Sequence, residues 1–211
     1  MISGGAKNLD PTAPALPSFN DASRANLFPF ALMCAGWITP LLKFWGLVWG
    51  VARPSDYSGG DVAPHAGLFL AACAAGVATW WLPRSWYRIR PFEASGRIYE
   101  YAGVRHFRKI VPNGDWVNAW RRRRDPSFRV VPNVRAAEEL RRRTIVGEKG
   151  HIVLLCLGAG SALFAWSIGW HAWAIYLGAA NVLANLYPVL LQRYTRARIY
   201  RLASRKALNP R

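Results

Sequence analysis

A carboxylate and an imidazole lie three residues apart at Glu148 and His151, in a stretch that we expect to be helical. Residues at positions i and i+3 of a helix share one face, so the carboxylate can orient the imidazole and stabilise its positive charge. An imidazole held in this way can take a proton from a hydroxyl group, as acyl transfer requires. The alternative is a pair of interfacial anchors, because paired titratable groups are often structural.

A second set of polar residues lies near the end of the chain. Asn185 and Gln192 are amides in or beside an apolar run, roughly two turns apart on a similar helix face. Polar side chains at that depth usually face the bundle interior or a cavity, and Pro188 frees a backbone carbonyl near Ala184. One interpretation is a polar pocket for the head of a substrate, and the other is a packing amide before a positively charged stop signal. The arginines that would close such a pocket are Arg193, Arg196 and Arg198.

A third set of residues forms a loop motif upstream of these two. Glycines at 96 and 103 are expected to make turns, and the charged residues between them specify no reaction, so a structured loop is the simpler interpretation. Residues 97–101 and 107–111 are expected to form short strands or to lie in the membrane interface, and Pro112–Asp115 is a turn signal. A helix is expected to begin near Asn133 and to continue into the apolar run that follows.

Two basic runs, Arg121–Arg124 and Arg141–Arg143, could bind nucleic acid, anionic lipid or the phosphates of coenzyme A. Their proximity to apolar runs favours lipid, at ~1 kcal/mol per basic residue near the surface, and no nucleic-acid-binding module is present. The sequence contains no Gly-rich phosphate loop, zinc motif or nucleophile elbow, so neither a cofactor nor a metal is predicted. The three cysteines at 34, 73 and 156 lie in apolar runs and are expected to serve in packing.

Long apolar runs position all of these residues. A bilayer core of ~30 Å needs ~20 residues of helix, a length that three of four runs reach, and Trp residues near the end of the second run can help it to span. Backbone groups in lipid must be satisfied within the segment, so the runs must be helical. We therefore predict an all-α membrane protein with about four transmembrane helices and a basic cytoplasmic loop between the second and the third. The runs cover residues 26–51, 66–82, 152–170 and 172–191.

The charge distribution predicts the orientation of these helices in the cell (inner) membrane. The chain has a net charge of +17, and residues 84–150 carry 17 Lys and Arg against 7 Asp and Glu. The tail from 193 to 211 has seven basic residues and no acidic one. By the positive-inside rule the loop and the tail are cytoplasmic, and an even number of spans places the N-terminus there as well. The predicted segments are a mobile arm (1–25), two transmembrane hairpins (26–83 and 151–192), the loop (84–150) and the tail (193–211).

Taken together, these segments resemble the glycosyl-4,4'-diaponeurosporenoate acyltransferase family, whose members are small membrane proteins that act late in the synthesis of glycosylated carotenoids. The resemblance runs from about Phe92 to Ile199 and is strongest over Ala184–Arg198, where Thr195 replaces the usual Asn. Glu148 and His151 are similar to the family's Glu-x-x-His at the start of a span. The positions that resemble the family's loop motif are Phe92, Glu93, Gly96, Tyr99, Gly103, Val104, Lys109 and Pro112.

The resemblance implies an integral-membrane O-acyltransferase that moves a fatty acyl group from a thioester donor to a sugar hydroxyl of a carotenoid glycoside or similar glycolipid. In that hypothesis His151 is the general base and Glu148 orients it. Asn185 and Gln192 hold polar groups of the substrate or the developing oxyanion, and the three arginines hold the donor's phosphates. The rival hypothesis is a non-catalytic accessory subunit of a larger, pigment-containing membrane-protein complex, for which the 11 Trp residues suit packing. A transporter is a third, weaker alternative.

Overall fold

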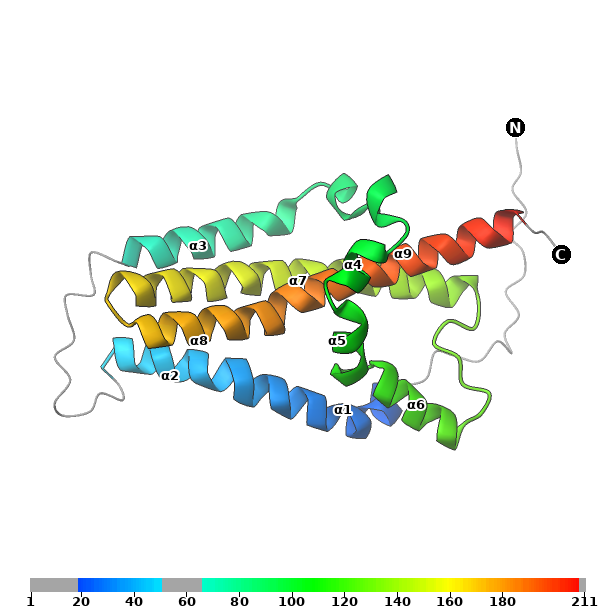
Figure 1. Cartoon of the computed structure of the whole chain (residues 1–211), viewed down its shortest axis with the longest axis horizontal. Coiled ribbons are helices and arrows are strands. Elements are labelled where there is room, and N and C mark those ends of the chain that lie inside the picture. Colours follow the sequence, from blue (N-terminus) through cyan, green and yellow to red (C-terminus); the bar gives the residue numbers. More distant parts are fainter. Residues whose placement is uncertain (1–18, 51–65, 209–211) are drawn as a thin grey trace.

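The computed structural model describes residues 19–50 and 66–208, and every regular element in that part of the chain is a helix. The predicted all-α fold is confirmed for these residues, and Figure 1 shows the long helices running side by side. The elements of the first half are α1 (Phe19–Met33), η1 (Cys34–Ile38), α2 (Thr39–Val48), α3 (Ala66–Ala78), η3 (Thr79–Trp81), η4 (Arg84–Tyr87) and η5 (Pro91–Glu93). Those of the second half are α4 (Arg97–Tyr101), α5 (Val104–Ile110), α6 (Asp115–Arg124), α7 (Val134–Ser167), α8 (His171–Asn181), η6 (Val182–Leu186) and α9 (Tyr187–Leu208).

Three helical stretches of the described chain are long and apolar enough to cross a membrane: Asn26–Val48, Val134–Ser167 and His171–Ser204. The fourth predicted span corresponds to the shorter apolar helix Gly67–Trp81. At ~1.5 Å per residue it is roughly 22 Å long, short of a ~30 Å bilayer core. The prediction of a membrane protein is thus supported, whereas the count of four spans is not confirmed.

Close contacts between small residues hold α3 against α7. An ideal Cβ on Gly160 of α7 would lie 2.4 Å from the Cβ of Ala72, and one on Gly76 would lie 3.0 Å from the Cβ of Cys156. Such small residues let two helix backbones approach closely in a bundle that has no water to expel. On the other side of α7, a turn through Gly169 (φ 81°) reverses the chain into α8, and aromatic residues of α2 pack against both helices around Phe44.

Two prolines coincide with widened helical turns. η1 and η6 are π-helical, and each ends two residues before a proline, Pro40 or Pro188. A proline has no N–H for the carbonyl four residues earlier and its ring crowds that carbonyl, so the helix widens there. The freed carbonyl of Gly36 accepts a hydrogen bond of 2.9 Å from the Tyr176 hydroxyl. The disturbance expected near Ala184 therefore takes the form of the π-helical turn η6.

The basic loop folds into short helices that pack across α9 toward α1 (Figure 1). The strands considered for residues 97–101 and 107–111 are wrong, because residues 97–101 form α4 and residues 107–110 lie in α5. Gly96 (φ 71°) and Gly103 (φ 76°) adopt left-handed backbone conformations just before the two helices, which start new helical turns instead of an extended segment. The predicted turn at 112–115 is confirmed, with Asn113 at φ 56°.

Two helices extend into the segments that the sequence analysis assigned to the arm and the tail. The Asn133 side chain accepts a hydrogen bond of 2.8 Å from the Ala136 N–H and begins α7 where predicted. The basic tail, in contrast, continues as the last turns of α9 as far as Leu208. Helix α1 begins at Phe19, within the stretch predicted as an arm. Residues 1–18, the 52–65 loop and residues 209–211 lie outside the described residues.

The close approach of α3 and α7 can be tested with Gly160→Ala. The added methyl group would overlap with Ala72, so we expect a loss of about 1–3 kcal/mol in the free energy of unfolding. Gly178→Ala on α8 is the matched control, because its Cβ would meet no atom within 4 Å. Unfolding in mixed micelles measures both, and equal stability of the two variants would contradict this packing.

Candidate functional site

Two carboxylates and two arginines form a buried cluster where the loop meets α7 and α9. Glu148 of α7 is 1% exposed, and its Oε1 accepts a hydrogen bond of 2.9 Å from Nη1 of Arg193. Its Oε2 accepts a hydrogen bond from Nη2 of Arg196. Among the described residues, Nε and Nη1 of Arg196 have no hydrogen-bond partner. We call Glu93, Glu148, Arg193 and Arg196 the carboxylate–arginine cluster, and their formal charges cancel.

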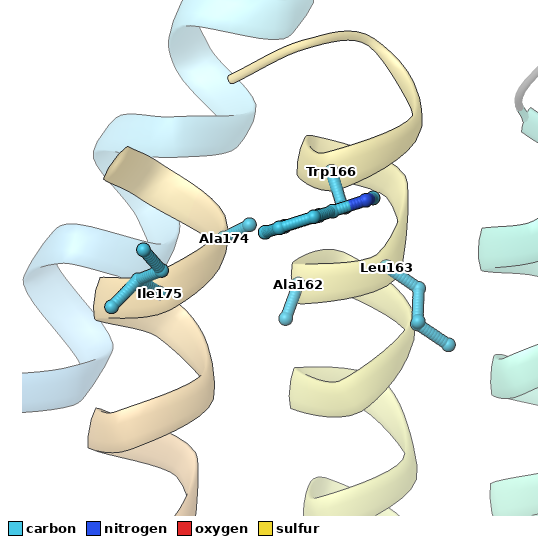
Figure 2. A pocket seen from close by; sticks show the side chains of 5 residues that line it. All are labelled: Ala162, Leu163, Trp166, Ala174 and Ile175. Carbon is cyan, nitrogen blue, oxygen red and sulfur yellow. The ribbon is translucent and has the colours of Figure 1, made fainter. Parts of the chain in front are cut away.

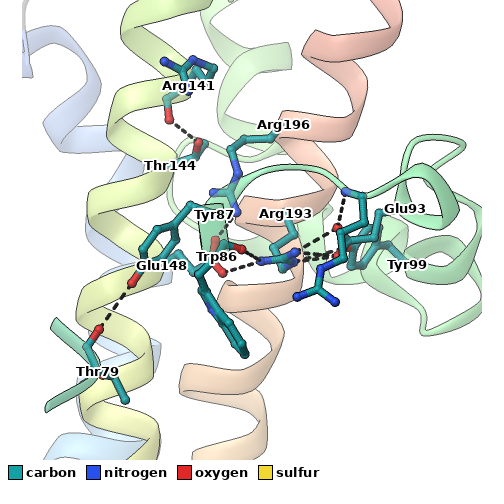
Figure 3. A network of polar contacts seen from close by, with 11 residues as sticks. Thr79, Trp86, Tyr87, Glu93, Tyr99, Arg141, Thr144, Glu148, Arg193 and Arg196 are labelled. Atoms are coloured by element: carbon teal, nitrogen blue, oxygen red, sulfur yellow. Dashed lines mark hydrogen bonds and ion pairs between the residues drawn. The ribbon is translucent and has the colours of Figure 1, made fainter. Parts of the chain in front are cut away.

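Arg193 joins the loop to the bundle by binding both carboxylates. Its Nε and Nη2 donate to Glu93 at 2.8 and 2.9 Å, while Nη1 faces Glu148. Figure 3 shows the Arg193 guanidinium between these two carboxylates. Arginine suits this position because its planar fork of donors can bind a carboxylate at two points and still donate elsewhere.

The phenol of Tyr99 completes the partners of Glu93. The Tyr99 hydroxyl donates to Oε1 of Glu93 at 2.6 Å, and the N–H of Arg90 donates to Oε2 at 2.8 Å. Burial would raise the pKa of Glu93, but the hydrogen bonds from Tyr99, Arg90 and Arg193 outweigh it and hold that pKa below its usual range. Burial, together with the hydrogen bond to Glu93, raises the pKa of Tyr99 to about 12. Glu93 is thus ionised and Tyr99 neutral at physiological pH.

Contacts with α9 fix the rest of the loop motif. Tyr194 donates from its hydroxyl to Glu100 at 2.9 Å, and its ring would be 3.2 Å from a Cβ on Gly96. Nη1 of Arg201 donates to the carbonyl of Ser95 at 2.7 Å. A side chain at position 96 would therefore meet both a strained backbone angle and an occupied space, which explains the glycine.

His151 lies one turn from the cluster and bonds to different partners. Its Nδ1 is 3.2 Å from Oδ1 of Asn185. The Nδ2 of Asn185 donates to Oδ1 of Asn181 at 2.7 Å, and the Nδ2 of Asn181 donates to the carbonyl of Leu155 at 2.9 Å. We call these four groups the amide chain. Both asparagines are buried, with exposures of 1% for Asn185 and 3% for Asn181.

Glu148, which was expected to orient His151, binds other groups in the structure. No hydrogen bond joins these two residues in the part of the chain that the structure describes, because Glu148 binds two guanidinium groups and His151 binds an amide. Hydrogen bonds between ionised partners are roughly twice as strong as neutral ones. The two arginines therefore take the carboxylate, although the imidazole is close by in sequence.

The other predicted site residues have different surroundings. Arg193 and Arg196, expected to hold phosphates, instead neutralise buried carboxylates, whereas Arg198 is exposed and lies over the Tyr194 ring at 5.9 Å. The amide of Gln192 occupies the space beside Gly147, where a Cβ would be 2.9 Å from its Nε2. In the loop motif, Glu93, Gly96 and Tyr99 are buried against α9 or the cluster, while Phe92 is 62% exposed.

Sequence reasoning missed Asn181 and underestimated Glu93. Asn181 lies four residues before Asn185 in an apolar run, and an amide pair at this spacing shares a helix face. That spacing is a signal for a buried hydrogen bond. Glu93 gave no comparable signal, because its partner Arg193 lies 100 residues away in the sequence.

An apolar pocket lies elsewhere on the bundle, between α7 and α8 near their connecting turn (Figure 2). Its nearest residue on α7 is 11 positions from His151, or about 16 Å along the helix. It offers no titratable group and so no means of acid–base catalysis. Its lining residues are Ala162, Leu163, Trp166, Ala174 and Ile175.

Replacing Arg193 by Met tests the cluster. The variant leaves Glu93 without its main ionic partner and Glu148 with only one arginine, so we expect the free energy of unfolding to fall by about 3–5 kcal/mol. The control is Arg143→Ala, which removes an exposed pair with Glu139 that is worth only ~0.3–0.5 kcal/mol. Equal losses in the two variants, measured in mixed micelles, would refute the stabilising role of the cluster.

The lowered pKa of Glu93 predicts acid sensitivity. Because the folded pKa lies below the ordinary value of 4.5, the native state binds fewer protons than the unfolded state. The stabilisation is complete above pH 4.5 and is lost as the pH falls through the folded pKa. We expect Glu93→Gln to be less stable at neutral pH and to lose less stability than the wild type on acidification, as thermal unfolding will measure. Parallel pH profiles would contradict this assignment.

One comparison with known proteins identifies the family of the chain. The glycosyl-4,4'-diaponeurosporenoate acyltransferase family model matches residues 83–205 of the 211-residue chain. The match covers the loop, α7, α8 and most of α9, and thus every residue of the cluster and the amide chain. No curated protein and no solved structure matches the chain. Since the match spans more than half of its length, the chain belongs to the glycosyl-4,4'-diaponeurosporenoate acyltransferase family.

Proposed function

We propose that this protein is an integral-membrane O-acyltransferase that transfers a fatty acyl group from a thioester to a sugar hydroxyl of a carotenoid glycoside or similar glycolipid. The observation that carries the proposal is an imidazole, held by a buried amide, inside the segment that matches the family. His151 stands where α7 changes from a charged sequence to an apolar one. A group at that position can meet a sugar head while the apolar tail of the acceptor stays in lipid.

The proposed reaction has His151 as general base. The imidazole removes the proton from the sugar hydroxyl as the hydroxyl oxygen attacks the thioester carbonyl carbon, and a C–O bond forms. The resulting oxyanion collapses, the C–S bond breaks, and the imidazolium returns the proton to the leaving thiolate. The products are an ester and a free thiol, so protons and electrons balance without a further reactant.

The remaining site residues take supporting roles in this proposal. The carboxylate–arginine cluster holds the loop motif against α7 and α9 beside His151. In this proposal Glu148 therefore has a structural role in the cluster and does not orient the imidazole. Gln192, which lies against Gly147 and precedes Arg193 of the cluster in the sequence, faces the polar head of the acceptor. Arg198, exposed on α9, attracts the phosphates of the thioester donor.

The proposed location is the cell (inner) membrane, with the basic segments 84–150 and 193–211 on the cytoplasmic side. The first turns of α1 and the last turns of α9 lie at the end of the bundle that also carries α4, α5 and α6 (Figure 1). That arrangement supports placing the two basic segments on the same side of the membrane. A thioester made in the cytoplasm would reach His151 from this face.

The decisive experiment is an acyl-transfer assay on purified protein in lipid nanodiscs, with a long-chain acyl thioester and a glycosylated carotenoid. General bases contribute ~10²–10⁴-fold, so we expect His151→Gln to lower kcat by at least 10²-fold. His171→Gln is the control, because the His171 ring lies against that of Trp166 near the C-terminal end of α7, with 4.5 Å between ring centroids, and is outside the proposed site. Unchanged turnover in His151→Gln would remove the catalytic role.

A different result would favour the rival function of an accessory subunit. In that case the wild type would show no transfer on its own, and it would co-purify with a larger membrane complex. The His151→Gln variant would then assemble normally and leave the activity of the complex unchanged.

A further inference from the structure

The amide chain has a direction, and that direction follows from its far end. A backbone carbonyl has no hydrogen to donate, so the carbonyl of Leu155 must accept. The atom of Asn181 that lies 2.9 Å from it must therefore be the amide nitrogen. This choice makes the other terminal atom of Asn181 an oxygen, which accepts the hydrogen bond of 2.7 Å from Asn185.

The direction of the amide chain also determines which nitrogen of the His151 imidazole carries the proton. Asn185 uses its nitrogen toward Asn181, so the atom that it presents to His151 is the oxygen. An amide oxygen only accepts, and the hydrogen bond to Nδ1 of His151 therefore requires a proton on Nδ1. In a neutral imidazole with a proton on Nδ1, the lone pair lies on Nε2.

We propose that Asn181 is a positioning residue for acyl transfer, because it acts through Asn185 to keep the proton of His151 on Nδ1 and the basic lone pair on Nε2. The inference rests on the proposed function, and it identifies Nε2 of His151 as the atom that takes the proton from the acceptor hydroxyl. Asn181 donates to a backbone carbonyl and accepts from Asn185, so it acts through other groups.

Burial makes this direction hard to reverse. Asn181 and Asn185 are 3% and 1% exposed, and a reversed chain would place an amide oxygen against the Leu155 carbonyl. Two acceptors facing each other in a buried site would leave both without a donor, which is unfavourable for each buried polar group. Water, which could otherwise relieve the mismatch, has little access to such buried side chains.

The Asn181 amide packs directly against Gly158 of α7. An ideal Cβ on Gly158 of α7 would lie 2.4 Å from both Cγ and Oδ1 of Asn181. Gly158 therefore creates the space that the amide occupies. Gly158→Ala should displace Asn181 without touching His151, which gives a second way to break the chain.

The test is the protonation state of the His151 ring, read by NMR on protein labelled with ¹³C,¹⁵N-histidine in nanodiscs at a pH where the ring is neutral. The His151 signals are assigned by their loss in His151→Gln. In the wild type we expect the bonded proton on ¹⁵Nδ1 and an unprotonated ¹⁵Nε2. Asn181→Leu, which keeps the side-chain volume, and Gly158→Ala should each give a mixture of the two tautomers.

Gly178→Ala is the matched control, since its added methyl group meets no atom within 4 Å and it lies on α8 one turn before Asn181. It should keep the wild-type spectrum. In the transfer assay, Asn181→Leu should lower kcat roughly 10- to 100-fold with little change in KM. This loss is smaller than the ~10⁴-fold effect of a histidine locked in the wrong tautomer, because a freed imidazole still samples the Nδ1–H form.

A proton on Nε2 in the wild type, or an unchanged spectrum in Asn181→Leu, would overturn the inference. The Gly158→Ala spectrum decides the matter if Asn181→Leu does not fold, and the wild-type spectrum alone can refute it. The proposed function fails separately. Inactive wild-type protein, or full activity in His151→Gln, would refute catalysis even if the proton is on Nδ1.

Discussion

Polar groups inside an apolar helical bundle must find their partners within it, and this constraint shapes the structure. Glu148 is almost fully buried in α7, so its charge has to be neutralised by neighbouring helices. Arg193 and Arg196 of α9 meet that need, and Arg193 also reaches Glu93 in the loop. A single guanidinium thereby ties the loop to both helices, which is why the short helices α4 and α5 have a defined place despite their length.

A second consequence of the same constraint is the position of His151. Pro188 deprives the preceding turn of a donor, and the widened turn η6 carries Asn185 toward α7. Gly158 lets α8 approach closely enough for Asn181 to reach a carbonyl of α7. A proline, a glycine and two amides thus orient one imidazole, and its hydrogen-bond partner among the described residues is a neutral amide.

Much of the fold could be predicted from local patterns, whereas the partners at the site could not. The apolar runs, the cap at Asn133 and the glycine turns at 96 and 103 depend on neighbouring residues, so the sequence indicates them directly. The expected strands fail because β-propensity over five residues is weaker than the glycine turns and the packing on α9. The partner of Glu148 could not be predicted, because α7 and α9 must first dock before residues 45 and 48 positions apart can meet.

The separation of the carboxylate–arginine cluster from the amide chain has a chemical consequence. Had Glu148 bound His151, the carboxylate would have stabilised the imidazolium and held its proton, which a buried ion pair does strongly at low dielectric. An amide orients the ring without adding a negative charge. The arginines, in turn, cancel the charges of Glu93 and Glu148, so the carboxylates exert a reduced field on the imidazole one turn away. In the reaction that we propose, this arrangement would keep the imidazole free to take a proton and to give it back, as both halves of an acyl transfer require.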